Sequence, residues 1–363
     1  MRYLQFIGLF NLLAWSIPVL AAVPFASDIV IAGREKKAQG RFSLDVPAPG
    51  EVIIAWMDQN STVHYSQIDF GKSGAQPGLV IADEVVCASA HQILGLRQDN
   101  AGVVRLGLNN GKFQVEWTRG ENGKWSAFNT EVQAAQYYAA LGGYDVNRRT
   151  GLGAFLTLDS EQRSVLIYKD EFDQWRRKVL ARDQSPISRG AITMTPAGEP
   201  AVAYQMLNSQ PTMIKAGLPA KLGQATNQAN TYYPLAITAD VDTLYLIVAL
   251  NIATITCYTS IDDGATWTQA GQLASRSSYG DGAYIAAAAA LRGGKVAALI
   301  PDGTVEEGYA LAVSTDSGRT WECQTLPGAS TQSASLGFDA VGELYVVYLN
   351  EKDKAVHLLT TRK

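Results

Sequence analysis

Short runs of alternating apolar and polar residues fill most of the chain, and turns rich in Gly, Pro, Asp and Asn separate them. The clearest example is "SASLGFDAVGELYVVYLN" (333–350), where two apolar runs flank an Asp-Ala-Val-Gly turn. Period-two alternation with β-branched and aromatic residues is typical of strands, and the turn residues mark where strands end. The pattern therefore predicts a strand, a tight turn and a second strand.

This strand–turn–strand plan recurs along the chain. Its copies are 42–58, 90–109, 139–159, 191–207, 235–251, 287–302 and 333–350. A third apolar segment follows each pair, and the last copy stops at its third segment, "AVHLLTTRK" (355–363). Repeats of this kind indicate an architecture in which each copy forms one small sheet beside the next.

A lone apolar segment near the other end of the chain, "SDIVIAG" (27–33), belongs to no copy. Pairing with 355–361 would give the last sheet its missing outer strand and remove an open edge. We therefore predict an all-β fold, a single β-propeller of seven four-stranded blades closed by the N-terminal strand. The alternative is six blades, with the weak copy over 187–224 as an insertion.

Two of the third segments lead into nearly the same turn. "SIDDGATW" begins at Ser260 and "STDSGRTW" at Ser314, and both fit Ser-x-Asp-x-Gly-x-Thr-Trp. An Asp in a tight loop can accept hydrogen bonds from backbone N–H groups, and Gly can adopt φ > 0. We therefore predict a structural role, not a catalytic one, for the residues of the motif. They are Ser260, Asp262, Gly264, Trp267, Ser314, Asp316, Gly318 and Trp321.

The motif resembles the Asp-box of sialidase-like and BNR-repeat propellers, and degenerate copies remain at 63–74, 115–128 and 166–179. In that superfamily the turn joins the third and fourth strands on the face opposite the functional one. The resemblance implies architecture more than activity, because Asp-boxes occur in enzymes and in binding proteins alike. It also implies that the functional face is built from the fourth-to-first and second-to-third strand connections.

Those connections are rich in Tyr, Ser, Gln and Asn, with several Arg. The segment "SRSSYGDGAY" (275–284) holds four charged or aromatic residues, and "PDGTVEEGY" (301–309) is expected to lie beside it. Polar and aromatic side chains in the mouth of a closed β fold are a common ligand-site arrangement. The predicted ligand-binding residues are Arg189, Tyr233, Arg276, Tyr279, Asp281, Tyr284 and Glu306.

Catalytic chemistry is only weakly indicated. A sialidase proper would be expected to have three convergent arginines and a Tyr-Glu pair, yet neither Tyr279 nor Tyr284 has an obvious Glu partner. A carboxylate pair for glycoside hydrolysis, about 5–10 Å apart, could come from Asp281 with Glu306 or Glu307. A lyase using His91 with a tyrosine is another alternative. No catalytic residue is assigned.

Composition excludes several other classes of function. The 363 residues are 47% hydrophobic and 18% charged, with a formal net charge of −4, which suits a large core and not a nucleic-acid partner. The three cysteines are far apart in the sequence, so no zinc site is predicted. We expect neither a metal nor a cofactor.

The N-terminus resembles a secretory signal. Arg2 precedes "YLQFIGLFNLLAWSIPVLAA", which ends in small residues, and cleavage after Ala21, Ala22 or Ala26 would fit. We predict a signal peptide over 1–26 and a propeller domain over 27–363. The alternative is an uncleaved anchor, since the run approaches the ~20 residues of a membrane span. No later segment is apolar enough to span.

The sequence thus favours a secreted or periplasmic propeller that binds a polar ligand, with a glycan as the favoured class. One alternative is a hydrolase or lyase acting on polysaccharide at the same face. Another is an envelope scaffold that docks a protein partner on the ring.

Overall fold

The structure is a computed structural model, and the residues that it describes lie between Val23 and Lys363. They are 23–70, 80–87, 92–97, 102–109, 112–121, 124–125, 129–133, 144–146, 153–158, 164–170, 172, 174–180, 190–206, 213–226, 233–251, 254–275, 287–301 and 308–363. These residues are almost entirely β, with one short 3₁₀ helix, η1 (Arg34–Lys36). Among them, no helix has the length and apolar character needed to cross a membrane.

The described strands form seven antiparallel sheets, and five of these sheets run in simple chain order. The first holds β2 (Ala38–Ala48), β3 (Glu51–Asp58), β4 (Val63–Asp69) and β5 (Val80–Cys87). Another holds β11 (Tyr144–Val146), β12 (Gly153–Leu158), β13 (Ser164–Lys169) and β14 (Trp175–Val179). The next holds β15 (Gly190–Met194), β16 (Pro200–Met206), β17 (Met213–Gly217) and β18 (Gly223–Thr226).

The two remaining sheets of this kind carry the repeated turns. One holds β19 (Tyr233–Ala239), β20 (Leu244–Asn251), β21 (Thr254–Ser260) and β22 (Thr268–Ser275). The other holds β23 (Ala287–Leu291), β24 (Lys295–Pro301), β25 (Gly308–Ser314) and β26 (Glu322–Pro327). A sixth sheet has an extra short strand and holds β6 (Gln92–Arg97), β7 (Gly102–Asn109), β8 (Lys112–Glu121), β9 (Lys124–Trp125) and β10 (Asn129–Gln133).

The last sheet joins both ends of the chain. Its order is β1 (Ser27–Ala32), β29 (Ala355–Thr360), β28 (Leu344–Asn350) and β27 (Ala329–Phe338). Asp28 pairs with Leu359 and Val30 with His357 in an antiparallel register. The predicted pairing of 27–33 with 355–361 is therefore present.

The weak copy over 187–224 is not an insertion into a neighbouring sheet. It forms the complete sheet β15–β18, in which each strand pairs with the next. The third strand, β17, is short, and a turn at 218–222 without the repeated motif follows it.

Two first strands begin earlier than the alternation predicts. The repeat copies 42–58 and 333–350 place their starts at 42 and 333, yet β2 starts at Ala38 and β27 at Ala329. In both strands the register slips: the pairs Gln39 with Met57 and Ser43 with Ala55 flank one irregularity. A β-bulge breaks the period-two pattern, so the residues before it no longer read as strand.

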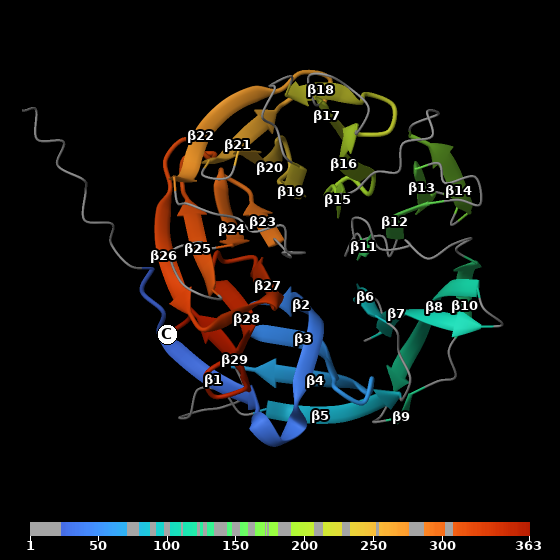
Figure 1. Cartoon of the computed structure of the whole chain (residues 1–363), viewed down its shortest axis with the longest axis vertical. Helices are drawn as coiled ribbons and strands as arrows, with labels where there is room; N and C mark the ends of the chain where they lie inside the picture. The colour runs from blue at the N-terminus through green and yellow to red at the C-terminus, as the bar shows by residue number, and fades with distance from the viewer. Residues whose placement is uncertain are drawn as a thin grey trace, which may run out of the picture.

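Figure 1 shows the sheets side by side around a common centre, with the first strand of each nearest to it. Each of these strands contacts the first strands of both neighbouring sheets. The strands in this order are β2, β6, β11, β15, β19, β23 and β27, and β27 in turn contacts β2.

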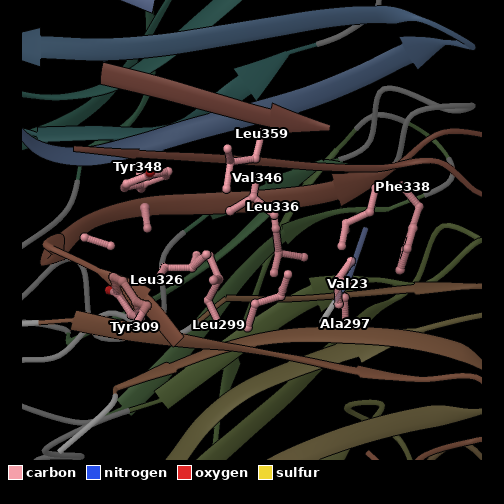
Figure 2. Packing of buried hydrophobic residues seen from close by; sticks show 14 residues of the cluster. Val23, Ala297, Leu299, Tyr309, Leu326, Leu336, Phe338, Val346, Tyr348 and Leu359 are labelled. Carbon is pink, nitrogen blue, oxygen red and sulfur yellow. The ribbon is translucent and has the colours of Figure 1, made fainter. Parts of the chain in front are cut away.

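The core lies between the faces of neighbouring sheets. In β28, Leu344, Val346 and Tyr348 belong to the cluster shared with sheet β23–β26, which Figure 2 shows from close by. The alternate residues of β28 pack toward β3 on the other side. Because both faces of a middle strand are buried, such strands are apolar almost throughout, and neighbouring sheets are packed tightly against each other.

Candidate functional site

The repeated turn after β21 is held by one serine and one aspartate. The Ser260 hydroxyl accepts a hydrogen bond from the Gly264 N–H at 2.8 Å and donates to the Asp262 carboxylate at 2.8 Å. That carboxylate also accepts from the Thr266 N–H at 2.9 Å and from the Thr266 hydroxyl at 2.6 Å. Three side chains thus satisfy the polar groups of one tight loop.

The turn after β25 repeats this arrangement. Ser314 accepts from the Gly318 N–H at 2.9 Å and donates to Asp316 at 2.8 Å. The Thr320 N–H and hydroxyl donate to Asp316 at 2.9 and 2.6 Å. Two turns with the same sequence pattern therefore have the same hydrogen bonds.

These hydrogen bonds also determine the protonation of the two aspartates. Donation from the hydroxyl and N–H of Thr266 and from Ser260 lowers the pKa of Asp262 from 3.8 to about 2. The hydroxyl and N–H of Thr320 lower the pKa of Asp316 to about 2 as well. A carboxylate so acidic, with both oxygens occupied, is a poor general acid or base near neutral pH.

Each repeated turn also docks onto the preceding sheet. The Gly223 N–H donates to the Gly264 carbonyl at 2.8 Å, and the Trp267 indole N–H donates to the Ala216 carbonyl at 3.1 Å. A Cβ on Gly223 would lie 2.2 Å from the Gly264 oxygen, so only glycine fits there without a shift. Glycine is thus required at this junction.

The next junction uses the same device. A Cβ on Gly271 of β22 would lie 2.4 Å from the Arg319 carbonyl oxygen. Trp321 is buried in the cluster between sheets β19–β22 and β23–β26, and its indole N–H donates to Gly318 at 2.9 Å. The repeated turns therefore hold neighbouring sheets together.

A degenerate copy keeps part of this chemistry. In the turn between β13 and β14, the Asp170 carboxylate accepts from the N–H groups of Phe172 and Gln174, both at 3.0 Å. Burial opposes ionisation of Asp170, but these bonds and the Arg176 guanidinium outweigh it and lower the pKa of the carboxyl.

A second repeated device was not anticipated from the sequence. Asp240 ends the first strand of its sheet, accepts from the Thr243 N–H at 2.8 Å and binds the Tyr245 hydroxyl at 3.1 Å. Asp339 holds the corresponding turn and binds the Tyr345 hydroxyl at 3.1 Å. The sequence signal that could have revealed this device is an Asp directly after a first strand, with the pair Leu-Tyr at the start of the second strand. It is seen in "DVDTLY" and "DAVGELY".

Burial and the nearby aspartate raise the pKa of both tyrosines to about 12. The hydroxyls of Tyr245 and Tyr345 therefore stay protonated and act as hydrogen-bond donors between strand and turn. This device too has a structural role.

Most of the predicted ligand-binding residues belong to connections that are expected at the end of the strands opposite the repeated turns. Ala287 pairs with Leu299 and Pro301 with Tyr309, so connections 276–286 and 302–307 leave the same end of sheet β23–β26. The turn at 315–321 leaves the other end of β25.

Most of these residues fall outside the part of the chain that the structure describes. They are Arg189, Arg276, Tyr279, Asp281, Tyr284 and Glu306. The backbone of Tyr233 is described: it is the first residue of β19 and pairs with Ala249. The assignment of these residues to a ligand site remains a prediction.

The described ranges contain no group of three or more His, Cys, Asp or Glu side chains that could hold a metal ion. Cys257 and Cys323 carry reduced thiols, and Cys257 is buried. Burial raises the pKa of the Cys257 thiol to about 12, so it behaves as a small apolar side chain.

No protein-family model matches the chain, and no curated protein matches it. Among solved structures, it is similar to a protein of unknown function from Dyadobacter fermentans, at 14% identity and a TM-score of 0.52. That match covers 93% of this chain and 98% of that one. It is also similar to an uncharacterized protein from Listeria monocytogenes, at 10% identity and a TM-score of 0.50, covering 88% and 94%.

A streptogramin B lyase matches at 12% identity and a TM-score of 0.49, over 92% of this chain and 96% of that one. The structural neighbours are β-propeller-like proteins. At such low identities, the likeness concerns fold alone. The arrangement of the four-stranded sheets in Figure 1 supports a β-propeller-like fold for this chain.

Proposed function

We propose that this chain is an exported, sialidase-like Asp-box propeller that binds a polar ligand on one face of its ring, and that the ligand is a glycan. The ring has seven four-stranded blades, and β1 closes it by pairing with β29. Support comes from the unbroken series of contacts between first strands and from the β1–β29 ladder.

The observation that carries the proposal is that the two ends of the sheets use their polar residues differently. At one end, the repeated turns 260–267 and 314–321 use their polar groups within the turn and dock on the neighbouring sheet. At the other end, connection 276–286 ends on β23, and connection 302–307 leaves the adjacent strand β24 and ends on β25. The polar and aromatic residues available for a ligand are concentrated in this second set.

The residue types there suit a sugar. Tyrosine rings offer apolar faces with a polar hydroxyl, and Asp, Glu and Arg can bond to ring hydroxyls. Arg276, Tyr279, Asp281 and Tyr284 share one connection, and Glu306 lies in the connection beside it. In the sequence, Arg189 directly precedes β15, and Tyr233 is the first residue of β19.

A glycoside hydrolase or lyase at the same face is the first alternative. A hydrolase would require Asp281 and Glu306 or Glu307 to act as a carboxylate pair, whereas a lyase would use His91 with a tyrosine. Release of reducing sugar from a bound polysaccharide would reveal either activity.

A protein scaffold is the second alternative. It is favoured by exposed apolar side chains in turns at the end of the sheets that carries the repeated motif. Ile261 and Val341 are 83% and 68% exposed, and Phe172 and Val241 are also exposed in turns of this kind. Single exposed apolar residues are common on protein surfaces, so this observation weighs less than the grouping of polar residues.

The test is a glycan-array screen, followed by titration of any ligand against Tyr279→Ala and Asp281→Asn. We expect each substitution to weaken binding at least about tenfold, the loss of about 1.4 kcal/mol. Ile261→Ser, on the turn face, serves as the matched control and should bind like the parent. If both site variants stay folded and bind like the parent, the ligand site is elsewhere.

A further inference from the structure

The segment that leads into β1 is packed as regularly as a strand. From Val23 to Ala26, buried or half-buried residues alternate with exposed ones, and the alternation continues into β1. The Ala26 N–H donates to the Thr360 carbonyl at 2.8 Å, which extends the β1–β29 pairing by one residue. The ordered edge of the sheet thus begins before the strand itself.

Val23 inserts into the core between two sheets. It is only 8% exposed and belongs to the cluster formed by β23–β26 on one side and β27–β29 on the other. Figure 2 shows it beside the labelled Ala297 and Phe338. Phe25, one alternation later, is partly buried against the same cluster.

Two other sheets place a tryptophan directly before their outer strand. The residue before β22 is Trp267, which packs against the cluster shared with the preceding sheet, and the residue before β26 is Trp321, which is buried in the next such cluster. In the last sheet no chain connects β29 to β1. Val23 and Phe25 instead supply apolar side chains to the cluster shared with the preceding sheet.

We propose that the export signal is removed after Ala21 or Ala22, and that residues 23–26 remain in the mature protein as a wedge between the last sheet and the preceding sheet β23–β26. The cut is hydrolysis of one peptide bond by a signal peptidase, with water giving a carboxylate on the leader and an amine on the mature chain. This inference rests on the proposed export. The small-residue rule alone would also permit a cut after Ala26.

A cut after Ala26 would remove Val23 and Phe25 from the cluster. A vacated site in a close-packed interface loses the burial of the missing groups, and a cavity remains unless the neighbours collapse. The new amine would lie on Ser27, at the end of the β1–β29 ladder. When residues 23–26 stay in the mature chain, the cluster keeps Val23 and Phe25, and no new amine forms on Ser27.

The first experiment determines the N-terminus of the exported chain. The full-length gene is expressed in a secreting host, and the protein recovered outside the cytoplasm is studied by N-terminal sequencing and intact mass. We expect Ala22 or Val23 as the first residue. Ser27 would overturn the inference while leaving export intact, whereas Met1 in every fraction would overturn export and the inference together.

The second experiment tests the wedge without depending on export. Two leaderless chains are made in the cytoplasm, one starting with Met-Val23 and the other with Met-Ser27, and their melting temperatures are compared. We expect the shorter chain to melt lower by at least about 5 °C. Melting temperatures within about 1 °C of each other would overturn the wedge.

Point variants of the longer chain give a matched comparison. Val23→Asp should lower the melting temperature, and Val23→Ala should do so to a smaller degree if the Asp variant fails to fold. Pro24→Ser changes an exposed neighbour and should melt like the parent. Equal melting of Val23→Ala and the parent would also count against the wedge.

Discussion

At the scale of single residues, Ser260 and Ser314 make hydrogen bonds that their turns depend on. Each is buried, and each hydroxyl accepts a backbone N–H from a glycine four residues later. That glycine has a positive φ, +97° at Gly264 and +80° at Gly318, so the chain reverses sharply there. The serine completes the hydrogen bonding of a backbone that cannot reach a strand partner.

Removal of this hydroxyl should therefore destabilise the fold. Ser260→Ala leaves the buried Gly264 N–H without its acceptor, and we expect a loss of ~1–3 kcal/mol in the free energy of unfolding. Urea denaturation of the variant and the parent measures the loss. Thr268→Ala, at an exposed position just after the turn, is the control. A Ser260→Ala variant as stable as the parent would contradict this role.

The acidity of Asp262 gives a second prediction at this scale. Its pKa is lowered from 3.8 to about 2, so the stability that its charge contributes is present above about pH 4 and is lost as the pH falls toward 2. Asp262→Asn should therefore melt below the parent at neutral pH, and the gap should narrow near pH 2. Ligand affinity should not change. A gap that is independent of pH would show that the carboxylate charge is not what holds the turn.

At the scale of elements, the alternation of apolar and polar residues predicted a strand well where that strand pairs with its neighbouring strands in a regular register. The pair expected over 333–350 corresponds to β27 and β28, and its Asp-Ala-Val-Gly turn joins them. Alternation did not predict the beginning of β27, because the register slips between Ala329 and Ala334. A β-bulge adds residues that are not paired with the neighbouring strand. The alternation of apolar and polar residues is therefore interrupted there, and it does not reveal where the strand begins.

The contact between a turn and the preceding strand gives a prediction for an element junction. Gly271→Ala would bring a methyl group to 2.4 Å from the Arg319 carbonyl oxygen, and backbone on both sides would have to move. We expect a loss of ~1–3 kcal/mol, typical of overpacking. Chemical denaturation is the measurement, with Gln269→Ala at an exposed position of the same strand as the control. If Gly271→Ala has the same free energy of unfolding as the parent, the two sheets can move apart at this junction without loss of stability.

The candidate ligand site was predictable in part. Strand order determines which connections share an end of the sheets, so the expected neighbourhood of 276–286 and 302–307 follows from the repeat alone. Side-chain directions do not follow. Gly280 and Gly282 allow many backbone conformations, and a connection has no ladder of hydrogen bonds to fix its register.

At the scale of the whole molecule, the two chain ends meet in one sheet, and a histidine links them. The His357 ring lies 2.8 Å from the Asp28 carboxylate of β1 and 2.9 Å from Asp353. Tyr348 stacks on the same ring, with centroids 5.4 Å apart. Burial alone would lower the pKa of His357, but the hydrogen bonds and charges of Asp28 and Asp353 outweigh it and raise the pKa above 6.5.

This raised pKa predicts a loss of stability as the pH rises above about 6.5. A cation favoured by the fold stabilises it fully below about pH 6.5, and the contribution disappears as the pH rises through the folded-state pKa. The melting temperature of the parent should therefore fall across that window, whereas His357→Gln should follow a flatter course. Parallel pH profiles of the two proteins would mean that the histidine does not link the chain ends through its charge.

The proposed closed ring depends on β1, and deletion of residues 28–33 tests it most directly. Without them β29 becomes an unpaired edge strand, and the clusters on both of its faces lose part of their cover. The decisive measurement is the melting temperature of the deletion variant beside the parent. A closed ring predicts a drop of at least about 10 °C, because a whole strand and its buried side chains are lost. A variant that melts with the parent would contradict closure by the N-terminal strand.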